Sequence, residues 1–137
     1  TLSGQAYGTW EWDMLKGGDA KTITVAFTSL DQDMDDCYRS SINATEAVNL
    51  VERSSASSSV IIASAGGYVN INQWYHWKFT RTKAGVFTLW IDETLIVADN
   101  GSNPVTDTTY TTSVFTVLDL DAGDRVANFT YKDEIQQ

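Results

Sequence analysis

Two carboxylates, Glu11 and Asp13, stand two residues apart near the start of the chain, interleaved with Trp10, Trp12 and Met14. In an extended strand successive side chains point to opposite faces, so the carboxylates share one face and the apolar residues the other. A carboxylate pair can supply the nucleophile and the general acid/base of a glycoside hydrolase. Solvated strand faces carry such charges more often than catalytic dyads do, and the sequence favours that interpretation.

His76 is the single histidine of the chain, and it could act as a general base if it faced a cleft. Alternation puts His76 and Lys78 on the strand face opposite Trp77 and Phe79. No recognisable Arg or Gln partner motif accompanies the histidine. A hydrogen-bonded histidine without a catalytic role is therefore the favoured interpretation.

Trp90 offers the best case for binding, because alternation separates it from the apolar residues of its own strand. A sugar ring can pack its apolar C–H face on such an indole while its hydroxyls reach polar neighbours. Hairpin pairing places Trp90 opposite His76 or Lys78. The predicted glycan-facing or partner-facing patch is Trp90, His76, Lys78, Thr88 and Asp92. The alternative is that a second sheet, a long loop or a neighbouring subunit covers Trp90.

Two acidic loops raise the question of a metal. Calcium binds six to eight oxygen ligands, and alternating carboxylates can converge on it. The first loop does not match an EF-hand, because Asp36 and Ile42 stand where Gly and Glu are required. The candidate calcium ligands are Asp31, Asp33 and Asp35, or Asp119, Asp121 and Asp124 of the second loop. A solvated acidic loop is the favoured alternative, and calcium is the one cofactor that the sequence suggests.

The elements that position these residues follow a period of two almost everywhere, as strands do. Turn-forming residues separate the strands, and the serine run at 54–59 is interpreted as a hairpin loop. The predicted strands are 8–15, 21–29, 37–42, 47–53, 60–64, 67–71, 74–81, 86–92, 95–98, 112–118 and 125–131. The sequence therefore predicts an all-β, two-sheet sandwich that forms one domain over residues 1–137.

Composition excludes several classes of partner. Eighteen acidic and nine basic side chains give a net charge of −9, which repels nucleic acid and anionic membranes. No apolar run is long enough to cross a bilayer, so no membrane insertion is expected. Cys37 is the single cysteine, so it can form neither an internal disulfide nor, with one histidine, a zinc site. The start at Thr1 suggests a processed or excised piece.

The hairpin NINQWYHWKFTRTKAGVFTLWIDETLI is the most informative stretch. Two tryptophans and a Thr80-Arg81 step precede a glycine turn, and a strand of alternating apolar residues ending in Asp92 follows it. This pattern resembles the laminin-G-like and concanavalin-A-like lectin/glucanase domains. The variant is similar to domains of secreted bacterial and phage structural proteins. The resemblance implies an antiparallel jelly-roll sandwich with a concave sheet.

Retaining glucanases of this fold carry a third carboxylate after the positions matched by Glu11 and Asp13. Leu15 or Lys16 stands there in this chain. We therefore predict a non-catalytic module that lies outside the cell or on a virion surface. It would recognise a carbohydrate or a cell-surface or virion protein as a lectin-like or adhesion module, or build a homo-oligomer or larger structural assembly. The alternative is a carbohydrate-active enzyme, a glycoside hydrolase or a polysaccharide lyase.

Overall fold

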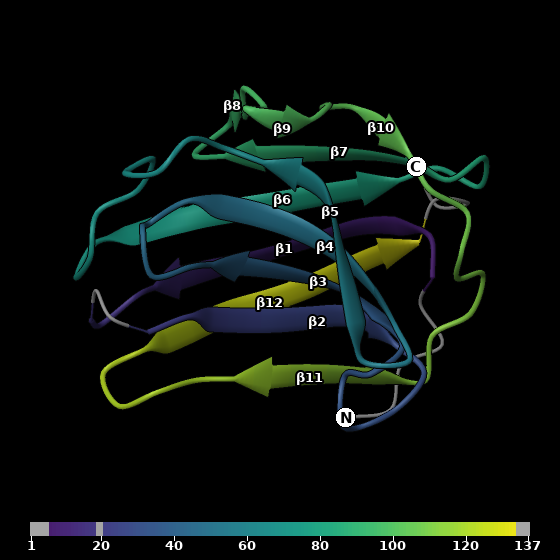
Figure 1. Ribbon diagram of the computed structural model, residues 1–137, viewed down its shortest axis with the longest axis horizontal. Coiled ribbons are helices and arrows are strands. Elements are labelled where there is room, and N and C mark those ends of the chain that lie inside the picture. Colours follow the sequence, from purple (N-terminus) through teal and green to yellow (C-terminus); the bar gives the residue numbers. More distant parts are fainter. Residues whose placement is uncertain (1–5, 19–20, 134–137) are drawn as a thin grey trace.

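The computed structural model describes residues 6–18 and 21–133, and it confirms the predicted all-β sandwich of two antiparallel sheets (Figure 1). We name the two layers the β1 sheet and the β2 sheet. The β1 sheet holds β10 (Val105–Thr106), β7 (Val86–Ile91), β6 (Trp74–Arg81), β1 (Gly8–Leu15) and β12 (Arg125–Asp133) in that order, with β8 (Thr94–Leu95) paired to β7. The β2 sheet holds β11 (Phe115–Asp119), β2 (Ile23–Ser29), β3 (Cys37–Ile42), β4 (Val48–Ser54), β5 (Ser57–Ala63) and β9 (Asn100–Gly101). No helix in the described part of the chain is long and apolar enough to cross a membrane.

The β1 sheet brings together strands that are far apart in the sequence. Strand β1 lies between β6 and β12, and β6 continues to β7 (Figure 1). In this register Asp13 faces His76 across the β1–β6 pair, and Lys78 faces Trp90 across the β6–β7 pair. Directly paired residues share a face of the sheet, so these four side chains lie on one face.

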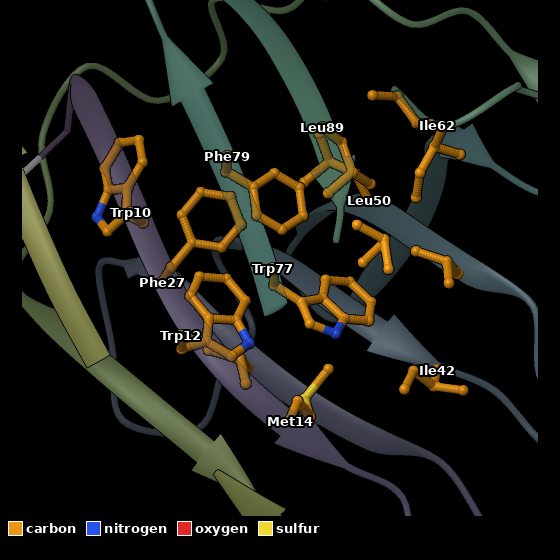
Figure 2. Packing of buried hydrophobic residues seen from close by; sticks show 14 of the residues in the cluster. Trp10, Trp12, Met14, Phe27, Ile42, Leu50, Ile62, Trp77, Phe79 and Leu89 are labelled. Atoms are coloured by element: carbon orange, nitrogen blue, oxygen red, sulfur yellow. The ribbon is translucent and has the colours of Figure 1, made fainter. Parts of the chain in front are cut away.

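The opposite face of the β1 sheet forms the core with the β2 sheet. Aromatic rings dominate this core: Trp12 stacks on Trp77 at a centroid distance of 6.2 Å, and Phe27 of β2 stacks on Phe79 at 4.8 Å (Figure 2). Trp77 is fully buried, on the face opposite His76 and Lys78, as the alternation of this strand predicts. The buried apolar side chains of β1 and β6 therefore pack against the β2 sheet. The polar side chains that alternate with them point away from it.

The strand predicted at 67–71 is wrong. Gly67 has a positive φ of 71°, and its N–H donates to the carbonyl of Thr45 at 2.7 Å. The N–H of Tyr68 donates to the carbonyl of Glu46 at 3.1 Å, so this segment closes a loop. Val69 is buried in the core, and one inward apolar side chain in a loop imitated the alternation of a strand. The strand predicted at 95–98 is likewise reduced to the short β8.

The serine run forms the predicted hairpin, but its loop is shorter than expected. Strand β4 ends at Ser54 and β5 begins at Ser57, so Ser55 and Ala56 alone connect them. Their φ angles of 48° and 63° are those of a two-residue turn whose twist matches the flanking strands. The remaining serines are part of the sheet.

Candidate functional site

A bridge of three ionisable side chains crosses the outer face of the β1 sheet. His76 Nε2 lies 2.8 Å from Glu11 Oε1, and His76 Nδ1 lies 2.7 Å from Asp13 Oδ1. Carboxylates only accept hydrogen bonds, so the imidazole satisfies both contacts when both of its nitrogens carry protons. We call this cluster of Glu11, His76 and Asp13 the imidazole bridge.

The bridge shifts the pKa values of His76 and Asp13 in opposite directions. The hydrogen bonds to Glu11 and then to Asp13 raise the pKa of His76 above its ordinary value of 6.5. Asn128 donates a hydrogen bond from Nδ2 to Asp13 Oδ2 at 2.7 Å, and this contact, followed by that of His76, lowers the pKa of Asp13. The favoured state is therefore an imidazolium held between two carboxylates.

A bulge in β12 brings Asn128 to the bridge. Glu11 pairs with Thr130 and Asp13 with Ala127, so β12 carries an extra residue at this point. Asn128 takes a positive φ of 56°, a conformation that asparagine tolerates better than most residues. The bulge turns its side chain toward Asp13 on the outer face.

The bridge borders an open hollow of about 350 Å³, lined by Glu11, His76, Lys78, Trp90 and Glu93. The Lys78 ammonium lies 5.1 Å from the centre of the Trp90 ring, within the range of a cation–π contact. Trp90 is partly exposed, and neither of the two sheets formed by the described residues covers this face. The hollow thus combines the aromatic surface of Trp90 with carboxylate acceptors and the ammonium of Lys78. We call it the Trp90 hollow.

The structure brings together three of the five residues of the predicted patch: His76, Lys78 and Trp90 line the Trp90 hollow. Thr88 points to the same face but pairs with Thr80, farther along the strands. Asp92 does not line the hollow either, and its carboxylate accepts a hydrogen bond from the backbone N–H of His76 at 2.8 Å.

Glu93 takes the place expected of Asp92, because a tight turn joins β7 to β8. Asp92 and Glu93 have positive φ angles of 49° and 66°, and this turn directs Glu93 to the hollow. Positive φ at two consecutive non-glycine residues leaves no signal in the alternation of the strand. Alternation predicted the correct face for Glu11 and Asp13. Nothing in the sequence indicated that His76 forms hydrogen bonds with them.

Trp74 was not among the predicted site residues, although it shares the parity of His76 and Lys78. It is 46 % exposed and lines a second hollow of about 170 Å³ with Asp13, Ala127 and Asn128. The alternation of β6 alone was enough to predict that Trp74 lies on the same face as His76 and Lys78. The other lining residues required the β1–β12 pairing, which connects the two ends of the chain.

The two acidic loops use carboxylates to hold their own backbone. Asp31 accepts hydrogen bonds from the N–H groups of Asp35 and Asp36 at 2.9 and 3.2 Å. Asp124 accepts from Gly17 at 2.8 Å and from Asp121 at 2.9 Å. Among the described residues no group of three or more acidic, histidine or cysteine side chains is placed to hold a metal ion. The structure therefore does not bring the carboxylates of Asp31, Asp33 and Asp35, or those of Asp119, Asp121 and Asp124, together around one point.

The bridge makes the stability of the protein depend on pH. Because the folded pKa of His76 is raised, its contribution is complete below about pH 6.5 and is lost as the pH rises through the folded value. The side chains of His76 and Glu11 are 41 % and 38 % exposed, and pairs this exposed contribute about 1 kcal/mol or less. We expect the melting temperature to fall by a few degrees between pH 5.5 and 8.5, within the usual response of a domain of this size to about 1 kcal/mol.

The matched control is His76→Gln, which removes the only histidine of the sequence. The melting temperature of this variant should be nearly independent of pH over this range. An equal pH dependence in wild type and His76→Gln would show that the bridge contributes nothing to stability.

Solved structures of known proteins share this architecture. No protein-family model matches the sequence, and no curated protein sequence is significantly similar to it. The carbohydrate binding module CBM66 from Bacillus subtilis is similar in structure, with a TM-score of 0.77 and 19% identity over 97% of this chain and 78% of that one. The Caenorhabditis elegans galectin LEC-6 gives a TM-score of 0.62 with 11% identity, covering 96% of this chain and 90% of its own. Galectin-Ib from Xenopus laevis gives 0.60 with 11% identity over 96% and 95%. At these identities the likeness establishes the shared fold, a β-sandwich that also occurs in a carbohydrate binding module and in galectins.

Proposed function

We propose that this chain is a non-catalytic glycan-recognition module that binds a sugar in the Trp90 hollow. The observation that carries the proposal is the composition of this open hollow, where Trp90 lies beside Glu11, His76, Lys78 and Glu93. Sugar sites typically combine one apolar platform with a few polar groups that fix the orientation of the ring. The fold shared with a carbohydrate binding module and with galectins supports the same role.

Different side chains of the Trp90 hollow contact different parts of the sugar. The indole of Trp90 offers a surface to the C–H face of a ring, and Glu11 and Glu93 accept hydrogen bonds from hydroxyls. Lys78 Nζ, 5.1 Å from the ring centre, covers part of the indole. Because Lys78 is a flexible side chain, a sugar ring displaces its ammonium sideways, where it donates to a hydroxyl oxygen.

The bridge geometry argues against the alternative of a carbohydrate-active enzyme. A lyase base needs a free imidazole nitrogen, whereas both nitrogens of His76 already contact carboxylates. A hydrolase needs a general acid with a raised pKa, and Asp13 does not fit that role because its pKa is lowered. Binding is therefore better supported than catalysis.

We expect Trp90→Ala to lower glycan affinity by about tenfold or more while the protein stays folded, because the substitution removes a stacking surface and no core volume. A glycan array identifies ligands of the wild type, and calorimetric titration compares the variants. Val97→Ala is the control, because Val97 is 78 % exposed and lies outside the hollow. If Trp90→Ala bound glycans as tightly as wild type, the Trp90 hollow would not be the site.

The setting of this module follows from its proposed ligand. Glycans are displayed mainly outside cells, so we place the module in an extracellular or virion-surface protein. Use as an adhesion module, or as a repeated subunit of a larger assembly, stays a prediction from the sequence resemblance.

A further inference from the structure

We infer that the ligand is an uncharged linear glycan of at least two sugar units, which extends from the Trp90 hollow across the imidazole bridge to Trp74. This inference rests on the proposed function and names the class of glycan. It follows from three features of the outer face: a second aromatic hollow, a hydrogen-bonded bridge between the two hollows, and an excess of negative charge.

The second hollow, with Trp74, Asp13, Ala127 and Asn128, adjoins the first through the bridge. Glu11 lines one hollow and Asp13 the other, and His76 hydrogen-bonds to both carboxylates. A ligand that enters both hollows must pass over the imidazole. The two hollows are therefore halves of one surface.

The separation of the two tryptophans fits more than one sugar ring. Trp74 and Lys78 are four residues apart on β6, which is about 13 Å at the rise of a strand. Trp90 is the direct partner of Lys78 on the next strand, about 4.8 Å away. The Cα atoms of Trp74 and Trp90 are thus about 14 Å apart by strand geometry, a distance that a single ring cannot cover.

The polar groups between the tryptophans are held in place before any ligand binds. Asp13 is fixed by His76 at 2.7 Å and by Asn128 at 2.7 Å, and Glu11 is fixed by His76 at 2.8 Å. Fixed acceptors lose little conformational entropy when a ligand binds, which favours recognition of regularly spaced hydroxyls.

The charge of the face selects against acidic glycans. The two hollows contain the carboxylates of Glu11, Glu93 and Asp13, against the cations of Lys78 and a protonated His76. The whole chain carries a net charge of −9. Uronate or sulfated chains are repelled by this potential, whereas neutral hydroxyls find acceptors.

The test uses an array of neutral glucan, mannan, xylan, galactan and fructan fragments of increasing length, with polygalacturonate and heparin as acidic probes. The series that binds is then titrated by calorimetry against wild type, Trp74→Ala, Trp74→Phe and Trp90→Ala. For wild type we expect affinity to rise by about tenfold or more from the single sugar to the longer fragments, equivalent to about 1.4 kcal/mol. Trp74→Ala should abolish this gain with length, and Trp74→Phe should restore part of it.

The outcomes separate this inference from the proposed function. If Trp74→Ala keeps the full gain with length, or if wild type shows no gain, the two-hollow surface is wrong while the Trp90 hollow stands. Stronger binding of the acidic probes than of every neutral series would overturn the uncharged class. If wild type binds no member of the array, or if Trp90→Ala binds as wild type does, the proposed function itself fails.

Discussion

Trp77→Ala is expected to lower the free energy of unfolding by about 3–5 kcal/mol, the usual cost of truncating a buried tryptophan. The Trp77 side chain is 0 % exposed and stacks on Trp12 and on Phe79, each at a centroid distance of 6.2 Å. Its loss leaves a cavity between the two sheets (Figure 2). Domains are typically stable by about 5–15 kcal/mol, so this loss is a large fraction of the total stability. Chemical denaturation followed by tryptophan fluorescence measures the change.

Two variants make this measurement specific. Trp74→Ala removes an exposed tryptophan from the same strand and should cost about 1 kcal/mol or less. Trp77→Phe keeps an aromatic ring and removes an indole N–H that is buried without an acceptor among the described residues, so it should cost less than Trp77→Ala. A Trp77→Ala protein as stable as Trp74→Ala would contradict the packing of the core.

Alternation alone was sufficient to sort the two sides of the β1 sheet. Trp77 and Trp90 stand on neighbouring strands with opposite parity, and the structure buries the first and leaves the second beside an open hollow. The prediction succeeded because β6 and β7 are joined by a short loop and run without irregularity between Trp77 and Phe87. Local periodicity fixes the faces of such a hairpin.

The composition of the site depends on contacts that local periodicity does not encode. Glu11 and Asp13 meet His76 only because β1 pairs with β6, more than sixty positions later in the chain. Asn128 reaches Asp13 through a bulge, and Glu93 reaches the hollow through a turn with positive φ. Irregularities of this kind move single side chains across a face, and they carry no repeating signal.

Arg81 shows the same limit inside the core. Its parity with Trp77 and Phe79 places it on the inner face, where a cation needs partners that the hairpin cannot supply. The structure provides them from elsewhere: the guanidinium donates to the carbonyls of Ala6 at 3.1 Å and Asp107 at 2.9 Å. It also donates to the hydroxyl of Tyr38 at 3.2 Å.

Aromatic rings surround the same guanidinium. Its central carbon lies 4.7 to 4.9 Å from the ring centres of Tyr7, Tyr38 and Phe87. Tyr38 in turn donates from its hydroxyl to a carboxylate oxygen of Asp107 and accepts from the N–H of Tyr110 at 3.2 Å. Arg81 therefore ties β6 to β3 and to the loop that precedes Tyr110, at one end of the sandwich.

Arg81→Met is expected to lower the free energy of unfolding by about 3 kcal/mol, because it leaves buried acceptors without a donor. The side chain of Arg81 is 1 % exposed, so water cannot replace the lost hydrogen bonds. Arg125→Met on the exposed part of β12 is the matched control and should change stability by about 0.5 kcal/mol or less. Denaturant unfolding of the two variants gives the comparison.

A double-mutant cycle with Tyr38→Phe separates the hydrogen-bond network from the simple loss of a charge. Tyr38→Phe removes the hydroxyl that joins Arg81, Asp107 and Tyr110 but keeps the ring that packs on the guanidinium. If the network acts as a unit, the cost of the double variant should fall short of the sum of the single costs by about 0.5–3 kcal/mol, the range found for residues that share a network. Strict additivity would mean that Arg81 stabilises this end of the sandwich through its stacking on Tyr7 and Phe87 and through the two carbonyls alone.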